Sequence, residues 1–209
     1  MSEAGATPRL TRRRLLALGV GSPVLAVGLE GAQLALATAA HAESGVRLAD
    51  ADRLRRLVSV ELLMLYCYEH VLAGSLLDAR SRRLITPLRA HEQAHVRVLS
   101  AHLTALGGTP PAPPASVKEA DRNLARRGVA GRLGQLTGGR DALFLLLAVE
   151  KVVVGAYFVA LIKLNDLQLV TLAAQIMAND AQHEALVGEA LYPGDAQKAV
   201  PSGLVQGTQ

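Results

Sequence analysis

The chain has 209 residues, of which 50% are hydrophobic and 19% are charged, and its formal net charge is +4. Aromatic residues make up only 3% and tryptophan is absent, which argues against a surface that stacks nucleic-acid bases. Because Cys67 is the only cysteine, an intrachain disulfide and a cysteine-based zinc site are both excluded.

The first 42 residues have the pattern of an export signal. Three arginines at positions 12–14 precede an apolar run, and Ala40-His41-Ala42 supplies small residues around a cleavage position after Ala42. The paired arginines resemble a twin-arginine signal, which would place the mature chain in the periplasm or cell envelope. The alternative is an uncleaved leader that anchors the chain in a membrane, but breaks in the apolar run favour cleavage.

Cleavage after Ala42 leaves residues 43–209, which are enough for one compact domain. The leader contains four arginines and two glutamates, so the mature chain has 18 basic and 16 acidic residues. Its net charge is therefore only +2, and we expect no nucleic-acid partner.

Apolar periodicity predicts four long helices in the mature chain. They cover residues 48–73, 81–106, 140–164 and 166–191. Residues 109–139, between the second and third helices, contain four prolines and are irregular apart from a short surface helix predicted at 116–126. Residues 193–209 have little to bury and are expected to form a flexible tail.

Two short turns and one long connection around four long helices define the expected fold. We predict an all-α four-helix bundle over residues 43–192, with one long crossover between helices 2 and 3. No stretch alternates strongly enough to indicate a sheet.

The polar residues that interrupt the apolar faces form two matching sets. The sets are offset by 89, 89, 88 and 88 residues, and each is divided between two consecutive predicted helices. Such a register indicates two helical hairpins related by an old duplication. The first set is Glu61, Tyr68, Glu92 and His95, and the second is Glu150, Tyr157, Asp180 and His183.

The carboxylates in these sets occupy positions where core residues are expected. Glu61 and Glu150 each have apolar residues three and four positions away on both sides. An unpaired buried carboxylate costs several kcal/mol, a large part of a total stability of about 5–15 kcal/mol. Two divalent cations would balance the charge of four carboxylates, with a carboxylate-x-x-His pair from one helix of each hairpin and a lone glutamate from the other.

The predicted ligand set is Glu61, Glu92, His95, Glu150, Asp180 and His183. Oxygen and imidazole ligands without a thiolate suit iron or manganese better than structural zinc. We expect Glu92 or Glu150 to bridge the two metals, and Tyr68 and Tyr157 to hydrogen-bond ligands across the bundle.

The mature chain resembles the ferritin-like superfamily of di-iron carboxylate proteins, and most of all its exported ferritin-like domain proteins. The resemblance covers most of residues 48–192 and is carried by Glu61, Glu92 to His95, Glu150, Asp180 to His183, and Gly107 to Pro110. It implies a centre of two iron ions, or alternatively manganese, that reacts with dioxygen or peroxide. Asp180 departs from the usual glutamate and puts activity in doubt more than fold.

Several alternatives stay open at this point. Arg89 is a candidate salt-bridge partner for the buried glutamates, and Glu184 competes with Asp180 as a ligand. His91 has no counterpart in the second set and is expected at the surface or rim. A non-catalytic structural or binding bundle of the cell envelope, with a degenerate metal site, is the alternative function.

Overall fold

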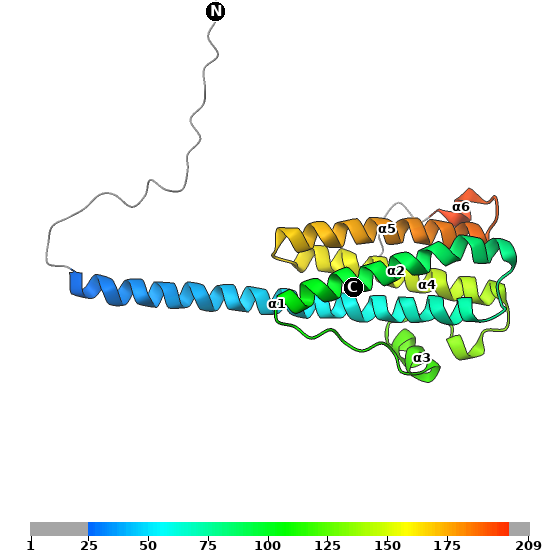
Figure 1. The fold of residues 1–209 in the computed structure, drawn as a ribbon. Helices are drawn as coiled ribbons and strands as arrows, with labels where there is room; N and C mark the ends of the chain where they lie inside the picture. The colour runs from blue at the N-terminus through cyan, green and yellow to red at the C-terminus, as the bar shows by residue number, and fades with distance from the viewer. Residues whose placement is uncertain (1–24, 201–209) are drawn as a thin grey trace, which may run out of the picture. The chain divides into compact units, whose positions relative to one another are not determined.

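A computed structural model describes the backbone of residues 25–200, and the side chains of residue 41 and residues 43–200. All regular secondary structure in the described residues is helical, and they contain no strand. The four long helices are α1, α2, α4 and α5 (Figure 1). The elements in order are α1 (Leu25–Ala73), α2 (Ala79–Ala105), α3 (Val117–Arg126), the 3-10 helix η1 (Leu133–Gln135), α4 (Gly139–Lys163), α5 (Leu167–Leu191) and α6 (Ala196–Ala199).

This architecture confirms the predicted all-α bundle with a long crossover between its second and third long helices. The crossover runs from α2 to α4 and contains α3 and η1. Residues 43–200 lie in one compact unit, which contains the bundle. The export signal predicted for residues 1–42 lies largely outside the described residues, since only helical backbone is described for 25–40.

The helix ends agree with local sequence signals. The carboxylate of Asp78 caps α2 by accepting a hydrogen bond from the Ser81 amide, and Asp166 caps α5 in the same way through Gln168 and Leu169. The predicted bounds of α2, α4 and α5 lie within two residues of the observed ones. The first helix differs, because it begins at Leu25 instead of residue 48. The intervening sequence is rich in alanine and has no proline, and the helix continues through its three glycines.

The helix α4 supplies much of the core. Eleven of its residues are buried, including Leu146, Val149 and Val153. It is also long and apolar enough to cross a membrane by composition alone, but half of its most apolar window is buried inside the bundle. Core helices pass the same test, and the buried polar residues Glu150 and Tyr157 on α4 fit a core helix.

The segment expected to be a flexible tail begins with a short packed helix. In α6, Ala199 is buried against Gly188 of α5. A Cβ atom at position 188 would lie 2.4 Å from the carbonyl oxygen of Ala199, so glycine permits the close contact. Residues 201–209 of the predicted tail lie outside the described residues.

A buried carboxylate joins α1 to the turn between α4 and α5. Asp50 is 2% exposed and accepts hydrogen bonds from the backbone amides of Asn165 and Asp166, from the Asn165 side chain and from Arg53. Burial alone would raise the pKa of Asp50, but these hydrogen bonds outweigh burial and lower it below its ordinary value of 3.8. The charged carboxylate therefore stabilises this end of the bundle.

We predict that Asp50→Ala lowers the free energy of unfolding by about 2–4 kcal/mol near pH 7, because two buried backbone amides lose their acceptor. A group with a lowered pKa stabilises the fold above its unfolded pKa and loses that effect as the pH falls. The difference between native and variant should therefore shrink below about pH 4 in urea unfolding measurements. An unchanged difference at pH 3 would contradict a role for the charge.

Candidate metal centre

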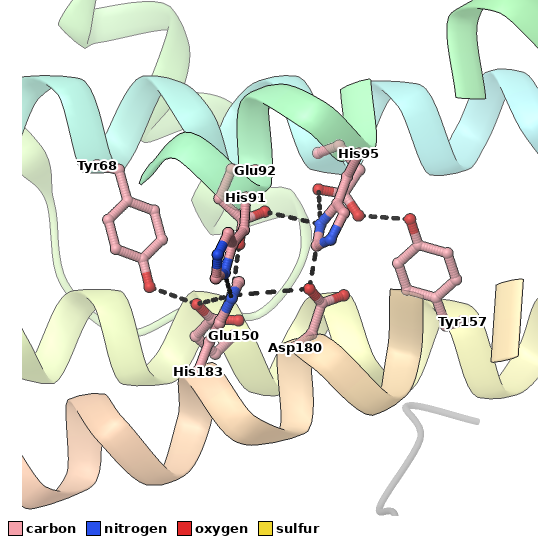
Figure 2. A network of polar contacts seen from close by, with 9 residues as sticks. Tyr68, His91, Glu92, His95, Glu150, Tyr157, Asp180 and His183 are labelled. Carbon is pink, nitrogen blue, oxygen red and sulfur yellow. Dashed lines mark hydrogen bonds and ion pairs between the residues drawn. The ribbon is translucent and has the colours of Figure 1, made fainter. Parts of the chain in front are cut away.

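Six titratable side chains from four helices meet at one level of the bundle core. The helix α1 provides Glu61, α4 provides Glu150, and α2 and α5 each provide a carboxylate and a histidine three residues apart. All four carboxylates are 0% exposed. Figure 2 labels all of these side chains except Glu61 and shows the labelled ones pointing toward one another from the surrounding helices. Glu92, His95, Asp180 and His183 are the pairs from α2 and α5.

Helical periodicity explains why the chain buries such polar groups. Leu57, Val58 and Met64, which neighbour Glu61 on its helix face, are all buried. Leu146 and Val153 have the same relation to Glu150. The apolar face of each helix must turn inward, and it carries the carboxylate into the core with it.

The six residues divide into two groups that share two members. One group contains Glu61 and His95, the other contains Glu150 and His183, and both contain Glu92 and Asp180. In each group one ligand atom per residue lies within 4.8 Å of the others. The core therefore offers two adjacent four-residue sites with common carboxylates.

The two imidazoles face the shared carboxylates through their Nδ1 atoms. His183 Nδ1 lies 2.7 Å from Glu92 Oε1, 3.6 Å from Glu150 Oε1 and 3.8 Å from Asp180 Oδ1. His95 Nδ1 lies 3.3 Å from the same Asp180 oxygen and 3.6 Å from Glu92 Oε2. Glu92 thus turns one oxygen toward each histidine, while a single oxygen of Asp180 faces both.

Two tyrosines join the halves of the cluster. Tyr68 on α1 donates a hydrogen bond to Glu150 Oε1 on α4, and Tyr157 on α4 donates one to Glu61 Oε1 on α1. Both phenols are fully buried. Each lone glutamate is therefore oriented by the hairpin to which it does not belong (Figure 2).

Most polar atoms that face the centre of the cluster have no hydrogen-bond partner. Among the described side chains, eight buried nitrogen and oxygen atoms lack a partner, and all eight belong to the six predicted ligands. The eight include His183 Nδ1 and Glu92 Oε1, which lie 2.7 Å apart without forming a hydrogen bond. Buried polar groups normally find partners, so this donor set fits metal cations. The atoms are Glu61 Oε2, both oxygens of Glu92, His95 Nδ1, Glu150 Oε2, both oxygens of Asp180 and His183 Nδ1.

Comparison with known proteins agrees with the observed fold. Residues 49–193 match the family model of the ferritin-like domain, and this stretch holds all six residues of the cluster. The chain belongs to the ferritin-like domain family.

The ferritin-like fold is also found among solved structures. The chain is similar to a conserved hypothetical protein from Mycobacterium tuberculosis, with a TM-score of 0.59 and 18% identity. The match covers 69% of this chain and 92% of that one, and at this identity it shows the fold alone. No curated protein matches the chain.

Burial raises the pKa of three of the four carboxyl groups in this ferritin-like core. The pKa of Glu61 rises to about 7 and that of Asp180 to about 10, with burial as the main cause and the charge of Glu92 as a further one. The pKa of Glu150 also rises, because burial and the charges of Glu92 and Asp180 outweigh the hydrogen bond from Tyr68. Without cations, the cluster resists holding its full negative charge.

The two histidines shift in opposite directions. Burial disfavours the charged form of both, but for His95 the carboxylates of Glu61 and Glu92 outweigh burial and raise the pKa to about 10. Burial and the charge of His95 lower the pKa of His183 to about 4. A neutral imidazole has a free lone pair, which is the form that binds a metal.

The structure brings all six predicted ligands and both tyrosines into one cluster. Glu92, one of the two expected bridging residues, belongs to both groups, whereas Glu150 belongs to only one, and Asp180 is the second shared residue. That Glu92 or Glu150 bridges two metals stays a prediction. Which carboxylates are shared depends on the rotation of each helix, and sequence spacing does not determine it.

The competing interpretations can also be placed. Glu184 lies outside both groups, with its Oε1 4.0 Å from Lys151. Arg89 pairs with the exposed Glu69 at 2.6 Å and not with the buried glutamates. His91 is exposed, as expected. Its ring also contacts His183, and the sequence pattern did not predict this contact because His91 has no counterpart in the second set.

We predict that the metal-free protein loses stability as the pH rises from about 6.5 to 10. In this range the folded chain retains protons on Asp180 and His95 that the unfolded chain has released, so each increase in pH favours unfolding. The opposite shift of His183 acts only between about pH 4 and 6.5.

Differential scanning calorimetry of chelator-treated protein across this range measures the effect. The Tm of native protein should fall with pH, and Asp180→Asn should reduce the fall because it removes one of the raised groups. The exposed Asp52→Asn should behave as native. A Tm independent of pH would contradict the assigned pKa shifts.

Proposed function

We propose that the chain is an exported ferritin-like protein that holds two iron ions, or alternatively manganese, and uses them in redox chemistry with dioxygen or peroxide. The observation that carries this proposal is the set of eight unpartnered polar atoms, all on six residues of one buried cluster. Iron oxidation or protection against oxidative stress is the expected role.

Charge balance supports two cations. Four fully buried carboxylates would carry four negative charges, and isolated buried charges cost several kcal/mol each. Two divalent cations cancel this charge and leave both histidines neutral. The two overlapping groups would each hold one cation through the two shared carboxylates, a glutamate and a histidine.

The chemistry of the donors supports iron or manganese. Every donor is a carboxylate oxygen or an imidazole nitrogen, and neither group contains a cysteine. Four residues per position, with shared carboxylates and no thiolate, differ from the closed cysteine-rich sites of structural zinc. When bound, such metals would supply electrons to an oxidant.

The protein residues have defined tasks in this proposal. Glu92 and Asp180 each face both histidines and would contribute a carboxylate to both cation positions. Tyr68 and Tyr157 fix one oxygen of Glu150 and Glu61 respectively, so the other oxygen of each is the unpartnered one. The apolar core around the cluster keeps bulk water away from the metals.

A non-catalytic binding or structural bundle is the second candidate. The observation that favours it is Asp180, which is one methylene shorter than glutamate and directs one oxygen at both histidines. Such a carboxylate has less reach, and the site could hold metal weakly or not at all. Metal content separates the two candidates.

We predict that native protein binds two equivalents of Fe²⁺ or Mn²⁺ per chain under anaerobic conditions. At a metal concentration of 100 times Kd, binding should add about 2.7 kcal/mol to stability and raise the Tm. Elemental analysis and calorimetry measure both effects. Glu61→Ala and His183→Ala should each lose binding, because each removes a ligand from a buried site.

Glu184→Ala is the matched control, since Glu184 neighbours His183 in sequence but lies outside both ligand groups. It should bind metal as native. Fewer than about one equivalent in native protein, unchanged in Glu61→Ala, would favour the non-catalytic bundle. Fe²⁺ oxidation and peroxide consumption, each measured on loaded protein, then distinguish between the expected reactions.

The proposed export has its own test. In the native host, the mature protein should begin at residue 43 and appear in the extracytoplasmic fraction, as intact-mass spectrometry would show. Replacing Arg12 and Arg13 by lysines should retain the full-length chain in the cytoplasm. A full-length native chain in the membrane fraction would instead support an uncleaved leader.

A further inference from the structure

One contact breaks the correspondence between the two halves of the cluster. His91 Nδ1 lies 2.9 Å from His183 Nε2, and the two rings stack with centroids 5.2 Å apart and planes inclined by 19°. Position 91 corresponds to Asn179 in the second hairpin by the same offset of 88 residues. Among the described residues, no side chain is hydrogen-bonded to Nε2 of His95, so only one histidine of the cluster has such a partner.

The two ring nitrogens of His183 have different surroundings. Nδ1 faces the carboxylates and has no hydrogen-bond partner, whereas Nε2 lies at hydrogen-bond distance from His91. A neutral imidazole has one N–H and one lone pair. With the proton on Nε2, the ring donates to His91 Nδ1 and turns its lone pair toward Glu92, Glu150 and Asp180.

We propose that His91 is a positioning residue that fixes the orientation and tautomer of His183, and thereby makes the two metal positions of this centre unequal. The inference rests on the proposed metal binding. A hydrogen bond to the outer nitrogen of a ligating histidine increases its basicity as a ligand. The position served by His183 has this support, and the position served by His95 does not.

The exposure of His91 makes this asymmetry testable by substitution. His91 is exposed and its ring covers the His183 side of the cluster, as Figure 2 shows. Replacing His91 therefore leaves the apolar core intact. Three variants separate the hydrogen bond from other effects: His91→Leu removes the acceptor, His91→Gln keeps one, and Asn179→Leu alters the corresponding position of the other hairpin.

A first measurement is the tautomer of His183 in Zn²⁺-loaded protein, since zinc is diamagnetic and competes well for nitrogen and oxygen ligands. Nitrogen-15 NMR of native protein should show a proton on His183 Nε2 that exchanges slowly with water. The His91→Leu protein should lose this slow exchange, and Asn179→Leu should keep it. An unchanged Nε2 proton in His91→Leu would overturn the proposal.

A second measurement is a calorimetric Zn²⁺ titration. Native protein should show two unequal binding steps. His91→Leu should weaken one step by roughly 10–100-fold and leave the other in place, and His91→Gln should restore most of the loss.

The outcomes distinguish this inference from the proposed function. Two steps that are unchanged in His91→Leu would overturn the role of His91 while the metal centre stands. Equal weakening of both steps, or the same loss in Asn179→Leu, would indicate a structural disturbance and would also overturn it. Native protein that binds neither zinc, iron nor manganese would overturn the metal centre, and this inference with it.

Discussion

The burial of four carboxylates at one level of the core is the constraint on which the rest of the structure depends. Each of these groups is fully enclosed, and burial raises the pKa of Glu61, Glu150 and Asp180. Apolar residues above and below the level supply the packing that keeps the bundle folded despite this cost. The two tyrosines and two histidines are arranged around the same level, and the proposed cations would offset the remaining cost of burial.

Much of the fold and the membership of the cluster could be predicted from the sequence. Apolar periodicity located α2, α4 and α5 to within two residues, and the capping carboxylates of Asp78 and Asp166 agree with the observed starts of α2 and α5. The repeated offset between Glu61 and Glu150 and their partners indicated which polar residues belong together. Such patterns can be read from the sequence because the spacing between two residues on a helix determines whether they lie on the same face.

Other features required three-dimensional information. The sharing of Asp180 and the contact of His91 with His183 depend on how far each helix is rotated about its axis. The spacing of residues along one helix does not determine that rotation. The start of α1 was placed too late because the apolar pattern of the bundle begins near residue 48, whereas the alanine-rich sequence before it is helical for reasons of propensity.

The paired bonds from Tyr68 to Glu150 and from Tyr157 to Glu61 have a consequence for fold selection. Apolar helix faces tolerate sliding, because a shift of one turn, about 5.4 Å, exchanges one set of aliphatic contacts for a similar set. The same shift would break both phenol–carboxylate hydrogen bonds at once and leave four buried polar groups without partners. These two hydrogen bonds therefore select a single longitudinal alignment of the two hairpins. Aliphatic packing alone would allow several alignments of similar energy.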